Sequence, residues 1–226
     1  MYASWPCPQP DGSPGEEMVL GFDKARSKRL LVIAPLFDEA NKFRHQAFQI
    51  MRRLDAQAID CFLPDLPGCN ESLALHGEQS IARWREAIAA AARHFRASQV
   101  LAIRSGAWLV PEGWAGWAYA PAKPGQILRG MLRARTLAAR EAGRSESADT
   151  LLAEGRERGL DLAGWSLGAE LVRELDAGAV APSEALTVIE QAEVGGKPLW
   201  LRAENDVDPA QADALAAIVA AGMTDA

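Results

Sequence analysis

Residues 99–108 carry a serine directly after a predicted buried strand. The run 100–103 is apolar at every position, which is typical of such a strand, and Gly106 marks a turn into the helix expected next. A sharp strand-to-helix turn is where a Gly-x-Ser-x-Gly motif presents a serine hydroxyl as a nucleophile. Aligned on that motif, Gly106 is kept, but Arg104 takes the nucleophile's position and Ser105 comes one residue late. The turn needed for acyl-transfer chemistry is therefore predicted, with a guanidinium at its tip.

A second segment, Gly-Trp-Ser-Leu-Gly at 164–168, matches the motif completely. Its surroundings are less suitable, because the apolar run before it, at 160–163, is short and no histidine follows it. We predict that Ser166 caps the start of a helix. Ser166 as a nucleophile stays open as the alternative.

A serine nucleophile needs a base within hydrogen-bond reach, and after this type of turn the chain order is Ser, acid, His. The three histidines, His45, His76 and His94, precede both serines. Residues 195–198, where the histidine would come, are Gly-Gly-Lys-Pro; a solvated lysine is protonated at neutral pH. Asp206 could supply the acid, although a capped helix beginning near residue 209 is the interpretation that we favour. The triad is predicted to be incomplete.

The elements that position these residues alternate between strand and helix. Apolar runs of strand length lie at 18–22, 29–34, 58–63, 100–103, 114–120, 185–190 and 198–202. Helical patterns lie at 41–54 with Asn41 as N-cap, 81–95 capped by Ser80, 126–142, 145–158, 166–175 and 210–221. This alternation predicts an α/β fold with a mainly parallel central sheet of about six strands and helices on both faces.

The chain length of 226 residues favours a single domain over 1–226. Within it we expect residues 1–15 to be a flexible arm, since they are rich in Pro, Gly and Ser, and residues 124–158 to form a small helical cap. Arginines gather on the predicted 126–142 helix, either as a solvated face or as an anion or partner surface.

Composition limits the function classes. The net charge of −6 argues against a general nucleic-acid binder, and no apolar stretch approaches the ~18–20 residues of a membrane span. The first residues lack the apolar core of a signal peptide, which favours a cytoplasmic location. Three cysteines without CxxC spacing predict neither a disulfide framework nor a zinc site: Cys61 is expected in the core, and Cys69 in a loop. No nucleotide, metal or cofactor motif is found, and the oligomeric state, including a homodimer, stays open.

An ordered set of segments resembles the α/β-hydrolase superfamily, and more closely the exosortase A system-associated hydrolases of the second type. These segments are Ala-Pro-Leu-Phe-Asp-Glu-Ala-Asn-Lys at 34–42, Asp-Leu-Pro-Gly-Cys at 65–69, Ile-Arg-Ser-Gly-Ala at 103–107, Gln-Ile-Leu-Arg at 126–129 and Gly-Lys-Pro-Leu-Trp at 196–200. The resemblance implies an α/β-hydrolase-like fold and a link to exopolysaccharide and exosortase systems. It also places the 37–42 loop where the superfamily has an oxyanion-hole donor, so Glu39, Asn41 and Lys42 are candidates for polar recognition there.

Two functions follow from these observations. The first is a serine ester, thioester or amide hydrolase that uses Ser105 or Ser166, with Asp206 as the acid. The second is a pseudoenzyme with a degenerate triad, whose Arg104 and neighbouring polar residues bind a small-molecule, carbohydrate or acyl ligand. A guanidinium presents a planar fork of donors to an anion, but it is neither a nucleophile nor a base at neutral pH. We favour the second function, and whether the chain is an enzyme stays open.

Overall fold

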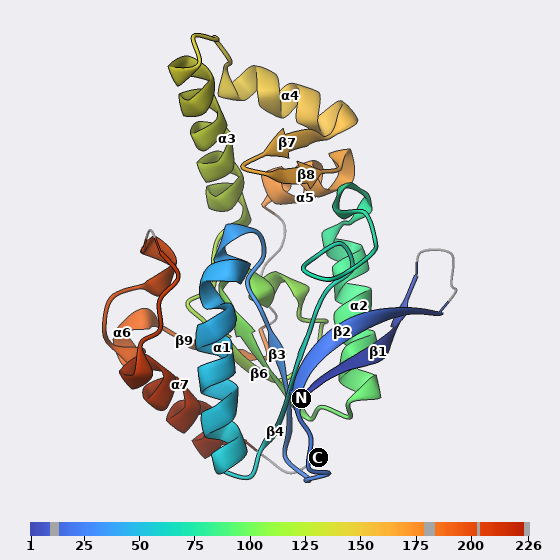
Figure 1. Ribbon diagram of the computed structural model, residues 1–226, viewed down its shortest axis with the longest axis vertical. Helices are drawn as coiled ribbons and strands as arrows, with labels where there is room; N and C mark the ends of the chain where they lie inside the picture. The colour runs from blue at the N-terminus through green and yellow to red at the C-terminus, as the bar shows by residue number, and fades with distance from the viewer. Residues whose placement is uncertain (10–13, 179–183, 203, 224–226) are drawn as a thin grey trace.

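A computed structural model describes residues 1–9, 14–178, 184–202 and 204–223 of the chain (Figure 1). Within these residues a central sheet is covered by helices on both faces, and a lobe built from α3, α4, α5, β7 and β8 stands above one end of it (Figure 1). No described helix is long and apolar enough to cross a membrane.

Seven of the described strands form the central sheet, in the order β1-β2-β4-β3-β5-β6-β9. Their bounds are β1 Tyr2–Pro8, β2 Pro14–Phe22, β3 Arg29–Ile33, β4 Asp60–Pro64, β5 Gln99–Ile103, β6 Gly116–Tyr119 and β9 Leu186–Ile189. The strands from β4 to β9 pair in parallel, whereas β2 is antiparallel to both of its neighbours. The predicted mainly parallel sheet is confirmed, with one strand more than expected.

The helices divide between the two faces of the sheet and the lobe. Helices α1 (Asp38–Ala56), α6 (Gln191–Val194) and α7 (Pro209–Gly222) share one core cluster on one face, and α2 (Ile81–His94) packs on the other face. The lobe holds α3 (Pro124–Glu141), α4 (Ala148–Arg158), α5 (Ala169–Ala177) and a hairpin of β7 (Leu160–Leu162) and β8 (Trp165–Leu167). Three short 3-10 helices complete the described elements: η1 His76–Glu78, η2 Arg104–Leu109 and η3 Leu199–Leu201.

Strand β3 shows why the sheet is buried on both faces. Leu31 and Ile33 pack into the core beneath α2, while Leu30 and Val32 pack into the core beneath α1 and α7. Successive strand residues point to opposite faces, so a strand that is apolar at every position needs cover on both sides. Because these strands are parallel, their carboxyl ends lie at one edge of the sheet, on the side of the lobe (Figure 1). The candidate site described below lies at that edge.

Three expectations about local structure are wrong. Part of the expected flexible arm is strand β1, whose Trp5 and Cys7 are buried and whose prolines are tolerated because β1 lies at the edge of the sheet. Helix α1 begins at Asp38 rather than after Asn41, and two acidic residues fill its first turn, where the helix dipole favours them. The run 198–202 contains η3 instead of a strand, and its Trp200 stacks on Phe43.

The expected helix cap at Ser166 is also wrong. Ser166 lies in strand β8, and α5 begins only at Ala169, with Gly168 at its N-cap position. Ala163 and Gly164 both have positive φ, at 50° and 86°, so they form a two-residue hairpin turn. By contrast, Ser80 caps α2 as predicted, and the predicted capped helix near residue 209 is α7, whose N-cap is Asp208.

Candidate functional site

The turn after β5 has the strained geometry of a nucleophile elbow. Arg104 follows the strand directly and has φ 54°, a conformation that side chains other than glycine rarely adopt. Two residues later, a Cβ on Gly106 would lie 2.5 Å from the carbonyl oxygen of Ile33 and 2.7 Å from that of Ala34. Glycine is therefore required at 106 for the turn to pack against β3. The elbow is present, and an arginine occupies its tip.

The Arg104 guanidinium is held by three hydrogen bonds and one aromatic ring. Its Nε and Nη2 donate to the two carboxylate oxygens of Glu39 at 3.1 Å each, and its Nη1 donates to the carbonyl of Ala120 at 2.7 Å. Its Cζ lies 4.0 Å from the ring centroid of Trp200, a cation–π contact. Of five N–H donors, one on Nη1 and one on Nη2 have no partner among the described residues. The pair is charge-neutral and keeps two donors for a ligand.

Ser105 is turned away from the pocket. Its side chain is fully buried, and its Oγ accepts a hydrogen bond of 2.8 Å from the backbone N–H of Leu36. Leu36 belongs to the loop between β3 and α1, which supplies one of the two oxyanion-hole donors in hydrolases with this elbow. The Ser105 hydroxyl thus engages one backbone N–H of this loop.

A pocket of about 430 Å³ opens in front of Arg104. Its floor and walls come from the elbow, the β3–α1 loop, α3, the hairpin tip and η3. Its lining residues are Leu36, Phe37, Asp38, Glu39, Arg104, Ala122, Gln126, Ile127, Gly130, Met131, Ala163, Trp165, Trp200 and Leu201. We call it the elbow pocket. It has the size of a small-molecule site, with mostly apolar walls and a few convergent polar groups.

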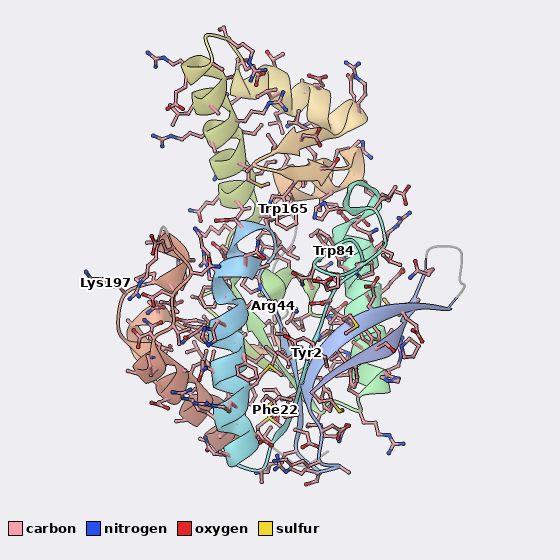
Figure 2. The ribbon with its side chains drawn as sticks, in the orientation of Figure 1. Tyr2, Phe22, Arg44, Trp84, Trp165 and Lys197 are labelled. Carbon is pink, nitrogen blue, oxygen red and sulfur yellow. The ribbon has the colours of Figure 1, made fainter. Side chains whose placement is uncertain are left out.

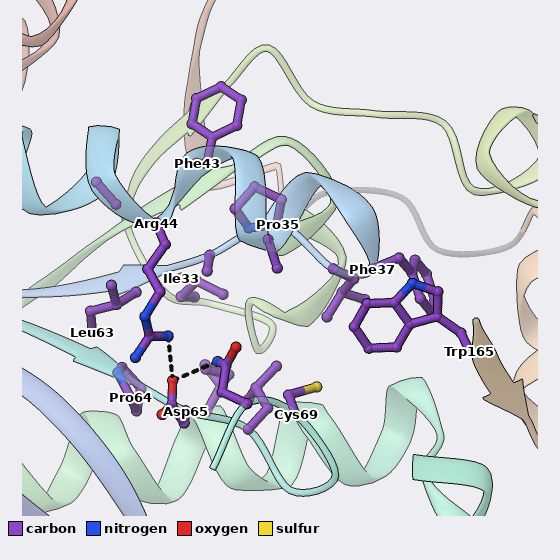
Figure 3. Close-up of a pocket in the computed structure, with 17 residues that line it drawn as sticks. Ile33, Pro35, Phe37, Phe43, Arg44, Leu63, Pro64, Asp65, Cys69 and Trp165 are labelled. Atoms are coloured by element: carbon purple, nitrogen blue, oxygen red, sulfur yellow. Dashed lines mark hydrogen bonds and ion pairs between the residues drawn. The ribbon is translucent and has the colours of Figure 1, made fainter. Parts of the chain in front are cut away.

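A second pocket, of about 30 Å³, adjoins the elbow pocket and is called the inner pocket (Figure 3). Phe37 and Trp165 stand at one end of it, and Arg44 and Asp65 at the other (Figure 3). There the Oδ1 of Asp65 accepts hydrogen bonds from Arg44 at 3.0 Å and from Asn70 at 2.7 Å. The residues between are mostly aliphatic, and Cys69 is among them.

None of the three histidines bonds to a serine hydroxyl in the part of the chain that the structure describes. His76 is the histidine beside the site: its Nδ1 lies 2.7 Å from the carbonyl oxygen of Ser166, and its ring packs 5.0 Å from the ring of Trp165. Because a carbonyl only accepts, Nδ1 carries the proton. Burial lowers the pKa of His76, which favours the neutral ring.

Other potential nucleophiles and bases near the site are held in their protonated forms. Burial raises the pKa of the Cys69 thiol to about 12 and that of the Tyr119 hydroxyl to about 12. Both groups are therefore protonated at neutral pH, so Cys69 does not supply a thiolate. Cys61 is fully buried in the core, as expected. Among the described residues no group of three or more His, Cys, Asp or Glu could hold a metal ion.

The remaining candidate residues lie apart from Arg104. Ser166 is exposed on β8 and lines a different, polar pocket with Asp161 and Arg135. Asp206 is half exposed and forms an ion pair with Arg202. Asn41 is exposed, and Lys42 pairs with Asp38 at 2.8 Å, one turn along α1. Of the predicted site residues, the structure brings together only Arg104 and Glu39 in the elbow pocket.

Three partners of the elbow were not found from the sequence. The Ala120 carbonyl, the Leu36 N–H and the Trp200 ring come from segments distant in the chain, and backbone groups carry no signature of their own. A signal existed only for Trp200, which lies in the segment 196–200 that carries part of the family resemblance.

Comparison with known proteins supports the fold. No protein-family model matches the sequence, and no curated protein matches it. Solved structures do: a hydrolase-like protein from Agrobacterium vitis S4 has 13% identity and a TM-score of 0.57 over 84% of this chain and 77% of its own. The α/β-hydrolase domain-containing protein 10 from mouse has 11% identity and a TM-score of 0.53 over 90% of this chain and 92% of its own.

The chain therefore has the α/β-hydrolase fold. At these identities the likeness establishes the fold alone, because one fold hosts many unrelated activities.

Proposed function

We propose that this chain is a non-hydrolytic member of its fold class and that the elbow pocket binds a small acyl compound. The observation that carries the proposal is Arg104 at the tip of the elbow, in contact with Glu39, Ala120 and Trp200. An always-protonated guanidinium cannot attack a carbonyl or accept a proton. The catalytic position is therefore converted into a binding position.

The environment of Ser105 supports the absence of hydrolysis. Acyl transfer needs a free hydroxyl, a base that accepts its proton and N–H donors aimed at the developing oxyanion. Here the hydroxyl is buried and occupies the Leu36 N–H, and no histidine ring lies within hydrogen-bond distance of it among the described residues. These contacts support a proposal in which the elbow does not transfer acyl groups.

The pocket indicates what kind of ligand fits. The two unpartnered N–H groups of Arg104 can donate to a carboxylate or to an acyl carbonyl. Phe37, Ile127 and Met131 offer apolar walls to the rest of the molecule. An acyl oxygen at Arg104 with an apolar body against these walls satisfies both parts of the pocket; a carbohydrate is the second candidate, because Trp165 and Trp200 supply flat aromatic surfaces.

The biological setting is part of the same proposal and rests on the sequence. The ordered segments at 34–42, 65–69 and 196–200 support an accessory role beside an exosortase or exopolysaccharide system. A single domain over 1–226, a cytoplasmic location and a homodimer belong to the proposal in the same way. Pull-down from cells that express the tagged chain together with such a system tests this setting, and recovery of none of its components contradicts it.

Two assays on purified protein test the molecular function. With p-nitrophenyl butyrate, we expect no turnover above the buffer rate for the wild type. Turnover that Ser105→Ala or Ser166→Ala abolishes makes the chain a serine hydrolase and overturns the proposal.

The second assay measures butanoate and methyl butanoate binding by calorimetry. Arg104→Gln removes the charge and changes the donor geometry, so we expect at least a tenfold weaker affinity. Arg53→Gln is the matched control, since Arg53 of α1 pairs with Asp213 of α7 and does not line the elbow pocket. Equal affinities in the wild type and Arg104→Gln contradict a binding role for Arg104.

A further inference from the structure

The elbow pocket and the inner pocket share a wall. Leu36, Phe37 and Trp165 line both of them. The rings of Phe37 and Trp165 meet edge to face, with centroids 5.8 Å apart. Trp165 lies where the lobe meets the body of the molecule, above Trp84 (Figure 2). This ring pair, here called the partition, is built from two segments that are 128 positions apart and lie in different layers.

The Phe37 half of the partition is conformationally strained. Phe37 has φ 60° and ψ −142°, and no side-chain hydrogen bond caps α1 at this position. An aromatic residue in this region is a genuine outlier, and such strain gathers at ligand clamps and switches. The surrounding structure, rather than the residue's own backbone preference, therefore maintains this conformation of Phe37.

The Trp165 half covers a polar atom that has no partner. The Nε2 of His76 is buried without a hydrogen bond among the described residues, and the ring of Trp165 lies beside it. With the proton on Nδ1, Nε2 is a bare acceptor, and leaving such an atom dry is unfavourable. Movement of Trp165 away from His76 would let water reach this nitrogen. Hydration of His76 Nε2 would therefore offset part of the contacts that are lost when Trp165 moves away.

Trp165 lies beside an exposed hairpin turn. Strands β7 and β8 have three residues each and form a sheet separate from the seven-stranded one. Leu162 and Leu167 anchor this hairpin in the core, whereas Ala163 and Gly164 at its turn are exposed. A shift confined to the turn and to Trp165 would therefore leave the seven-stranded sheet undisturbed.

We propose that the partition opens and that the inner pocket is the second compartment of the ligand site, so that the ligand is an unbranched acyl chain whose oxygen meets Arg104 and whose apolar end passes between Phe37 and Trp165. This inference rests on the proposed acyl-binding function and names the shape of the ligand.

The inner pocket selects an apolar end. Its volume of about 30 Å³ has room for about two waters, and Ile33, Leu63 and Ile88 are among its walls. The polar groups at its far end, Arg44, Asp65 and Asn70, already bond to one another. A methyl end would gain dispersion contacts with these aliphatic walls, whereas a polar terminus that stops short of Arg44 and Asp65 would lose its hydration against them.

A chain-length series tests the inference. The probes are straight-chain carboxylates from butanoate to dodecanoate and their methyl esters, which separate a charged head from an acyl carbonyl. We expect affinity to rise about fourfold for each added CH₂ that is buried. Ala40→Leu fills the inner pocket, since Ala40 lines it and does not line the elbow pocket. This variant should bind dodecanoate at least tenfold more weakly and butanoate as the wild type does.

The matched control is Ala82→Leu, at an exposed position on α2. It should leave the whole series unchanged. If no acid or ester of any length binds, the proposed function fails. If butanoate binds but the series is flat, or if Ala40→Leu weakens every length equally, only the second compartment fails.

Access to Cys69 gives an independent readout. Cys69 lines the inner pocket and is only partly exposed, so an opened partition makes it more accessible to methyl methanethiosulfonate, and mass spectrometry locates the modification. Trp165→Ala should speed the modification of Cys69 at least tenfold, and dodecanoate should slow it in the wild type. Buried Cys61 is the internal control for unfolding. An unchanged rate at Cys69 in Trp165→Ala, with the fold intact, overturns the partition.

Discussion

The segments 102–106 and 164–168 divide a serine-hydrolase motif between them. The first has the elbow geometry without the motif's serine, and the second has the complete motif without the geometry. Strand β5 is central and parallel, so the chain must leave its end sharply and turn back toward α2. The second segment lies in a hairpin, where Gly164 forms the turn and Ser166 points to solvent. The difference shows that the position of a segment in the sheet, rather than its match to the sequence motif, determines whether it forms an elbow.

Substitution of a glycine in each segment should give the largest difference in stability between the two segments. At Gly106 a Cβ would clash with backbone oxygens of β3 and of the residue after it, so we expect Gly106→Ala to lower the free energy of unfolding by about 3 kcal/mol. At Gly164 a Cβ meets nothing within 4 Å, and only its φ of 86° is unfavourable, so Gly164→Ala should lose about 1 kcal/mol. Urea denaturation followed by tryptophan fluorescence measures both. Equal losses contradict a close-packed elbow.

Breaking the ion pair Arg104–Glu39 should change stability more than breaking the ion pair Arg202–Asp206, and this is the second largest expected difference. Arg104 and Glu39 are only 15% and 18% exposed, so Arg104→Met leaves a largely buried carboxylate without its partner. We expect a loss of about 2 kcal/mol, less than for a fully buried pair. Arg202→Met breaks the exposed pair with Asp206 and should change stability by no more than about 0.5 kcal/mol. A double-mutant cycle of Arg104→Met with Glu39→Gln isolates the coupling, and an interaction energy near zero contradicts the pairing.

The losses of stability on replacing Ser105 and Ser166 should differ by a smaller amount. Ser105→Ala leaves the buried N–H of Leu36 without an acceptor, which costs about 1.5 kcal/mol. Ser166 is exposed and no hydrogen bond of its hydroxyl is seen in the described part of the chain, so Ser166→Ala should stay within about 0.5 kcal/mol of the wild type. Thermal denaturation distinguishes the two variants. A larger loss at Ser166 than at Ser105 contradicts the burial described for each.

Much of the fold was predictable because its signals are local. The all-apolar runs of β3 and β5, the capping residues Ser80 and Asp208, and the alternation of elements each point to the same parallel sheet. Strand β1 was missed because its prolines hide an alternation in which Trp5 and Cys7 face the core. Whether an edge strand forms depends on a partner, here β2, which a local pattern does not contain.

The site was predictable only in part. Gly106 fixes the register of the elbow, so counting back two residues placed Arg104 at its tip, and the cost of burying an unpaired guanidinium predicted a partner there: Glu39, Asp65, a backbone carbonyl or a bound anion. The partition was not predictable, since Phe37 and Trp165 meet through tertiary packing alone. The positive φ of Phe37 and Ala163 has no sequence signal either, because neither is a glycine.

The smallest expected effect concerns pH and separates the hairpin from the elbow. His76 packs against Trp165, and burial lowers its pKa in the folded state below the ordinary value of 6.5. In the unfolded chain the ring takes up its proton as the pH falls through about 6.5, while the folded protein resists protonation. The stability that His76 contributes is therefore fully present above this pH and is lost as the pH falls below it.

We expect the free energy of unfolding of the wild type to fall between pH 7.5 and 5.5 by more than that of His76→Gln, which has no titrating ring. His45→Gln is the control, at an exposed position on α1, and should retain the wild-type dependence on pH. Urea titrations at the two pH values measure the difference. Because Nδ1 of His76 bonds to the carbonyl of Ser166, the same loss should appear as faster amide exchange in β7 and β8 than in β5 at low pH. Equal pH dependence in the wild type and His76→Gln contradicts a neutral, half-buried His76 and, with it, the buried Nε2 without a hydrogen bond beside the partition.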